Sequence, residues 1–156
     1  MPFDIAEFQI PAEAKEADPF DYRTFTPGLE GLRKLAWVLR HPEVWPKGQS
    51  WNFMFVEYEQ SCGTMGCAIG IGRNLWPELK DATTTMAFGA DVAKTAQAFK
   101  IAPGDAHELF YDIRAYGQED TGAGFARVTP ADVASAIDAY LARAEALAKS
   151  EAGGTP

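Results

Sequence analysis

The sequence predicts a mainly α-helical protein: a single compact domain of about five helices with at most one short strand or hairpin, and an extended N-terminal arm. Its 156 residues suffice for one domain with a hydrophobic core, and 47% of them are apolar. Apolar residues recur at helical spacing in several segments, two of which begin with the Thr-Pro pair that is typical of a helix start. Only one stretch, residues 51–58, resembles a β-strand.

The arm is expected over residues 1–25. This segment contains three prolines and many acidic residues, and its apolar residues are irregularly spaced. Phe3, Phe8 and Phe20 are expected to anchor it, either on its own domain or on a partner. The helical domain then spans residues 26–149, and residues 150–156 are expected to form a disordered tail.

The first helix is expected to begin at Thr26, whose hydroxyl can cap it, with Pro27 in the first helical position. His41 ends it, because the residue before a proline avoids the helical region. Its apolar face comprises Leu29, Leu32, Ala36 and Leu39.

The strand candidate is WNFMFVEY, residues 51–58, which is short and rich in aromatic residues. It carries apolar residues on both faces, and no second segment is an equally good strand candidate with which it could pair. A buried extended segment and the start of a helix are therefore the alternatives. A glycine-rich helix is expected next, from about Thr64 to Trp76, closed by Pro77.

The remaining helices are expected at about 89–99, over APGDAHELFYDIRAY at 102–116, and after Thr129, with a loop over 117–127. In the last helix Thr129 is the cap and Asp132 stands where the acid of a capping box belongs. The apolar stripe of that helix comprises Val133, Ile137, Tyr140, Leu141, Ala144 and Leu147.

Charge and cysteine content exclude several classes of partner and location. The formal net charge is −8, which disfavours nucleic acid and anionic membrane surfaces, because both bind through Lys and Arg. No apolar run is long enough to span a bilayer, and the N-terminus lacks the basic start and long apolar stretch of a secretory signal. Two cysteines do not make a disulfide framework. We therefore expect a soluble cytoplasmic protein.

The stretch SCGTMGCAIGIG contains both cysteines and is the best candidate site. If Thr64 caps a helix, Cys62 lies just outside the positive end of that helix, which favours a thiolate. Gly63 lets backbone amides turn toward an oxyanion. A nucleophile also needs a base, and the two histidines of the chain, His41 and His107, are the candidates.

Packing is the competing interpretation of the same stretch. Free cysteine is among the most buried residue types, and Gly66 and Gly70 would leave one side of the predicted helix open to close approach. A disulfide between Cys62 and Cys67 is disfavoured in the cytoplasm. No metal site and no cofactor are expected, because neither histidine has a second ligand near it in sequence.

Aromatic residues near the cysteines suggest where a ligand would bind. Trp51 and Tyr58 precede the motif, and clustered aromatics line many ligand pockets. Together with Gly63 and Thr64 they are the candidate ligand-binding residues.

Cys62-Gly63-Thr64 with Cys67 and Gly70 forms the pattern CGT-x-x-C-x-x-G. This pattern resembles a group of small uncharacterised bacterial and phage proteins. Further matches over residues 29–147 are Pro103, Ala106, Leu109-Phe110 and Thr129-Pro130. This chain departs from the pattern at Arg73 and Asn74 and in its long segment at 117–127. The resemblance implies an architecture and no activity.

These observations favour a non-enzymatic protein that binds another protein or assembles with itself. The acidic composition, the aromatic-anchored arm and the incomplete catalytic set support this expectation. The alternative is a small cysteine-dependent hydrolase or transferase that uses Cys62, with His41 or His107 as the base.

Overall fold

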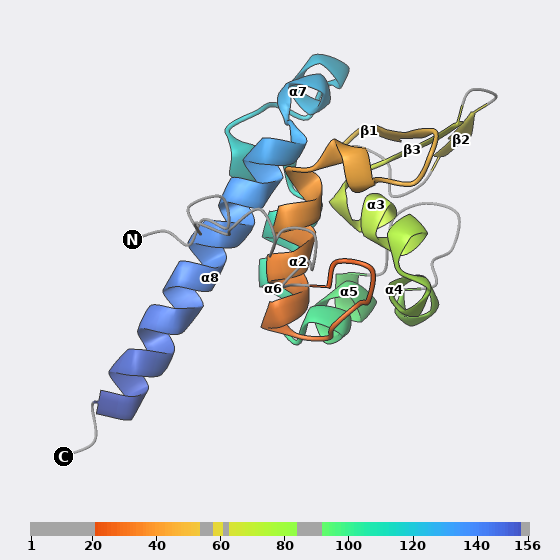
Figure 1. Cartoon of the computed structure of the whole chain (residues 1–156). Coiled ribbons are helices and arrows are strands. Elements are labelled where there is room, and N and C mark those ends of the chain that lie inside the picture. The colour runs from red at the N-terminus through yellow and green to blue at the C-terminus, as the bar shows by residue number, and fades with distance from the viewer. Residues whose placement is uncertain (1–20, 54–57, 61–62, 84–91, 154–156) are drawn as a thin grey trace.

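The computed structural model describes residues 21–53, 58–60, 63–83 and 92–153. Within these ranges most residues lie in helices (Figure 1), so the prediction of a mainly α-helical protein is confirmed. The α-helices are α2 (Leu29–Leu39), α3 (Ala68–Leu75), α4 (Pro77–Ala82), α5 (Val92–Phe99), α6 (Pro103–Phe110), α7 (Gly122–Arg127) and α8 (Pro130–Gly153). Two 3-10 helices are η2 (Pro42–Val44) and η3 (Ile113–Tyr116).

A small mixed sheet lies at one end of the helices (Figure 1). Its strands are β1 (Gln49–Trp51), β2 (Tyr58–Gln60) and β3 (Gly63–Gly66). The central strand β3 runs antiparallel to β2 and parallel to β1. The β2–β3 pair is the hairpin that the prediction allowed, but β1 is a third strand that it did not.

The single strand predicted over 51–58 is therefore wrong. β1 ends at Trp51 and β2 begins at Tyr58, while residues 54–57 lie outside the described residues. The predicted helix start at Thr64 is wrong as well, because Thr64 is part of β3. β3 has two glycines in four residues, so its local propensity disfavours a strand. Hydrogen bonds to β1 on one side and to β2 on the other stabilise the extended conformation.

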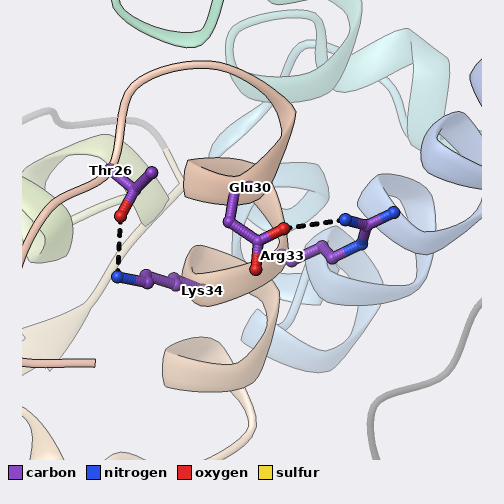
Figure 2. A network of polar contacts seen from close by, with 4 residues as sticks. All are labelled: Thr26, Glu30, Arg33 and Lys34. Atoms are coloured by element: carbon purple, nitrogen blue, oxygen red, sulfur yellow. Dashed lines mark hydrogen bonds and ion pairs between the residues drawn. The ribbon is translucent and has the colours of Figure 1, made fainter. Parts of the chain in front are cut away.

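Helix α2 begins two residues later than the Thr-Pro pair predicts. Its N-cap is Gly28, with a φ of 84° that glycine adopts readily. The Thr26 hydroxyl does not cap the helix but accepts a hydrogen bond of 2.7 Å from Lys34 Nζ, as Figure 2 shows. Lys34 Nζ also donates to the Thr24 carbonyl at 2.8 Å, so this buried cation ties the preceding segment to α2.

Two aromatic residues of that preceding segment pack into the core. Phe25 contacts the rings of Trp76 and Phe99, at centroid distances of 5.7 and 5.8 Å. Tyr22 stacks on Trp37 at 5.2 Å, and its carbonyl accepts a hydrogen bond of 2.5 Å from Trp76 Nε1. The end of the predicted arm is thus anchored, whereas residues 1–20 lie outside the described residues.

Pro77 ends α3 as predicted, but it also opens α4. The two helices meet at Gly72, where an added Cβ would lie 2.9 Å from Leu79 Cδ2 and 3.3 Å from the Trp76 ring. Leu79 and Trp76 are fully buried. Gly72 is thus a site of close approach in α3, where Gly70 is also buried, while Gly66 is part of β3 and does not belong to the helix in which the sequence predicted it.

The single helix predicted over 102–116 is wrong beyond Phe110, where the structure has a break and a 3-10 helix. α6 ends at Phe110 and η3 follows, with Asp112 accepting a hydrogen bond of 3.0 Å from the Arg114 amide. The loop predicted over 117–127 is wrong, because α7 occupies its second half. The Thr121 hydroxyl caps α7 by accepting a hydrogen bond from the Gly124 amide at 3.0 Å.

The capping box of α8 is confirmed. The Thr129 amide donates to Asp132 Oδ2 at 2.9 Å, and the Asp132 amide donates to the Thr129 hydroxyl at 3.1 Å. The disordered tail predicted over 150–156 is wrong for residues 150–153, which continue the alanine-rich helix α8 to Gly153. None of the described helices is long and apolar enough to cross a membrane.

Helices α2 and α8 form the centre of the fold. They run in opposite directions, and the C-terminal part of α8 projects beyond the other helices (Figure 1). Arg40, at the end of α2, forms an ion pair with Asp138 of α8 at 2.6 Å, and the Asp138 side chain is 4% exposed. The buried face of α8 consists of Val133, Ala134, Ile137 and Leu141.

Replacing Asp138 by alanine is expected to destabilise the protein by about 3–5 kcal/mol, because Arg40 would lose the carboxylate that offsets its desolvation. Urea unfolding followed by circular dichroism measures this loss. Glu30→Ala is the matched control, since Glu30 pairs with Arg33 at 2.7 Å but its side chain is 43% exposed. That exposed pair is expected to contribute less than about 1 kcal/mol. Equal losses in the two variants would contradict the central role of the Arg40–Asp138 pair.

Gly72→Leu is expected to destabilise by about 1–3 kcal/mol, because the new side chain collides with Leu79 and Trp76. The control is Gly104→Leu in α6, where an added Cβ meets nothing within 4 Å. Leucine at position 104 is expected to leave the melting temperature unchanged or to raise it, because leucine has the higher helix propensity. An unchanged melting temperature for Gly72→Leu would mean that α3 and α4 can separate freely.

Candidate functional site

The sheet brings the four predicted ligand-binding residues onto neighbouring strands. Trp51 lies in β1 opposite Gly66, and Tyr58 lies in β2 opposite Met65. Gly63 and Thr64 belong to the central strand β3 between them. The sequence therefore identified residues that share one sheet, although it assigned Thr64 to a helix.

Trp51 has a structural partner. Its half-buried indole donates a hydrogen bond of 2.7 Å from Nε1 to the Val128 carbonyl, at the end of α7. This bond links the sheet to the start of α8. The indole N–H therefore already has a hydrogen-bond acceptor. This bond accounts for a tryptophan at position 51 without a bound ligand.

The proposed environment of Cys62 is not present. Cys62 itself lies outside the described residues, but Gly63 begins a strand and α3 begins only at Ala68. The prediction that Cys62 stands at a helix N-terminus is therefore wrong. The prediction depended on the positive end of a helix dipole next to Cys62. The backbone that follows Cys62 is the extended strand β3 instead.

The cysteine at a helix N-terminus is Cys67, which is the N-cap of α3. Burial raises the pKa of the Cys67 thiol, and the backbone amides of Gly70 and Ile69 lower that pKa by less. Burial outweighs the helix terminus because Cys67 is only 2% exposed and belongs to the hydrophobic core. The packing interpretation is confirmed for Cys67.

The two histidines lie on separate elements. His41 follows α2, stacks on Trp37 at a centroid distance of 4.0 Å, and has Nδ1 2.7 Å from the Trp37 carbonyl. His107 is exposed on α6. Among the described residues no group of His, Cys, Asp and Glu is arranged to hold a metal ion.

A groove of about 350 Å³ lies between α6, η3 and α8. Its apolar part includes Leu109 of α6 and small side chains of the other two elements, among them Ala136 and Ala139 of α8. Carboxylates of α6 and a guanidinium of α8 form its rim, provided by Asp105, Glu108 and Arg143. This volume falls within the range of ligand and side-chain pockets.

Hydrogen bonds hold the two tyrosines of the groove in place. Tyr140 donates to Asp105 Oδ2 at 2.8 Å, and Tyr116 donates to the Leu109 carbonyl at 2.6 Å. Burial raises the pKa of Tyr140 to about 12, with the hydrogen bond to Asp105 and the charge of that carboxylate adding to the effect. Both phenols therefore stay protonated at neutral pH and act as donors.

The groove continues along α8 toward its free end. Ala136, Tyr140, Arg143 and Leu147 follow one another at intervals of four, three and four residues, which places them on one face of the helix. Leu147 is 64% exposed, the most exposed large apolar side chain among the described residues. The prediction that Leu147 belongs to the apolar stripe that α8 buries is wrong, because the core ends near Leu141.

A second hollow, of about 460 Å³, is lined by residues of α4 and α5 and by Phe25 and Pro27. Its lining residues Ala82 and Lys94 flank residues 84–91 in sequence, which lie outside the described residues.

Comparisons with protein-family models, with curated proteins and with solved structures found no match to this chain. The resemblance based on the CGT-x-x-C-x-x-G pattern stays a prediction.

Cys67 is expected to resist iodoacetamide in the native protein at pH 8 and to react after unfolding, because its thiol is buried and protonated. Peptide mass spectrometry of the labelled protein measures this separately for each cysteine. Cys67→Ala is expected to destabilise by about 1–2 kcal/mol through the small cavity that it leaves. Fast native labelling of Cys67 would show that the start of α3 opens readily.

Proposed function

We propose that this protein is a non-enzymatic cytoplasmic domain that acts by binding a protein partner or by assembling with itself. The observation that carries the proposal is the exposed Leu147 on the part of α8 that projects beyond the core (Figure 1). Residues 145–151 of α8 are exposed, and propensity alone stabilises such a helix end only a little, so we infer that a partner covers it.

The groove beside this helix supports the same proposal. An apolar centre with a charged rim is the usual arrangement of a protein–protein contact surface. Leu109 and the alanines provide the apolar centre here, and Asp105, Glu108 and Arg143 the charged rim. Because Leu147 continues the groove along α8, one bound helix would cover both features.

The expected location is the cytoplasm, because the two cysteines do not make a disulfide framework. The alternative of a Cys62 enzyme loses its main support, because the helix that was to activate the thiol starts at Ala68. Iodoacetamide labelling of Cys62 across a range of pH tests the non-enzymatic part of the proposal. An ordinary thiol pKa is expected, and a strongly depressed one would overturn this part.

Light scattering on the full chain tests the assembly part. We expect the average mass to rise above the 17.0 kDa of one chain as the protein concentration rises. Added salt is expected to strengthen the association, because two copies with a net charge of −8 repel each other and salt screens that repulsion. A mass of one chain at every concentration and salt level would leave binding of a different protein as the only form of the proposal.

A further inference from the structure

We propose that two copies of this chain pair through antiparallel α8 helices, with Leu147 of each copy inserted into the α6–η3–α8 groove of the other. This inference rests on the proposed function and specifies its partner. A protruding apolar side chain and a groove with small lining residues occur on the same face of the same helix.

The spacing along α8 allows both contacts to form at once. Ala136 and Leu147 are separated by roughly 16 Å at the rise of an α-helix, 1.5 Å per residue. When a second α8 lies antiparallel on this face, Leu147 of each copy reaches the region of Ala136 in the other. A twofold axis between them makes the two contacts identical, as a closed dimer requires.

The groove has the shape that such a contact needs. In helix packing a side chain inserts between residues of the facing helix that lie about one turn apart. Ala136, Ala139 and Tyr140 are spaced in this way on α8, and all three line the groove. The two alanines leave space for Leu147, while Leu109 of α6 contributes apolar surface beneath it.

Charges on the rim also complement each other. Arg143 lies near the middle of the paired segment, and its guanidinium is 5.6 Å from the ring centroid of Tyr140. Tyr140 in turn binds Asp105. Near the twofold axis the Arg143 of each copy therefore faces the Asp105 and Glu108 carboxylates of the other copy.

A second copy fits these observations better than an unrelated partner. One chain supplies both the protruding leucine and the groove. The groove is lined by charges of both signs, with Asp105 and Glu108 on α6 and Arg143 on α8. The proposed contact involves one helix face and one groove of each copy. We expect it to bury less surface than a standard interface, which buries about 1,600 Å² in total, and therefore to dissociate on dilution.

Complementary variants test this geometry. Leu147→Glu removes the inserted side chain, and Ala139→Lys, at an exposed position, blocks the groove. Each variant alone is expected to shift the dimer dissociation constant by at least about tenfold, measured by sedimentation equilibrium. A mixture of the two is expected to recover dimers, because one contact is then unaltered and the other pairs the introduced carboxylate with the introduced ammonium. Ala148→Glu introduces the same charge at an exposed position on another face of α8 and is expected to dimerise like the wild type.

Circular dichroism confirms that each variant is folded before its mass is interpreted. Wild-type dimers that persist in both variants would overturn this interface while leaving self-assembly intact. A wild-type chain that is monomeric throughout would overturn both. A chain that becomes dimeric only after residues 1–20 are deleted would assign the groove to that segment, and masses that keep growing beyond a dimer would contradict the twofold pairing.

Discussion

The antiparallel contact between α2 and α8 is the constraint on which the other elements depend. Residues of the two helices that are nearly a hundred positions apart in sequence meet there, and the Arg40–Asp138 ion pair sets their register. A buried pair of this kind adds little net stability, but removing either charge leaves the other without compensation. Every register that separates Arg40 from Asp138 is penalised accordingly. The rest of the described core then packs around the two helices, with α3 and α5 against α2 and α6 against α8.

Buried cations connect the helices to the irregular segments. Lys34 donates to a carbonyl and a hydroxyl before α2, and Arg73 donates to the carbonyl of Thr83 after α4. Both side chains are less than 10% exposed, at 6% and 7%. A buried ammonium or guanidinium must have hydrogen-bond acceptors, so each one holds a particular backbone conformation in place. This explains why Thr26 is not a helix cap: its hydroxyl serves Lys34.

The cysteine stretch shows how a local pattern and its environment compete. A helix N-terminus stabilises a thiolate, but the helix begins at Ala68, after Cys67, and therefore not beside Cys62. At Cys67 the amides of α3 do stabilise the thiolate, yet the loss of hydration in the core outweighs them and raises the pKa. In contrast, the groove on α8 has no sequence signature of its own, because it forms from three elements. Its position beside an exposed leucine is the basis of the self-pairing that we propose.

The sequence by itself determined the features that rest on short-range interactions. The capping box of Thr129 and Asp132, the helical spacing in α2 and α8, and the break at Pro77 all involve residues within one turn of each other. Only the tertiary structure decided the rest. β3 is a strand because β1 and β2 flank it, Gly28 replaces Thr26 as the cap because Lys34 takes the hydroxyl, and Leu147 is exposed because the core ends before it. These outcomes depend on which distant residues meet, and periodicity and propensity carry no information about that.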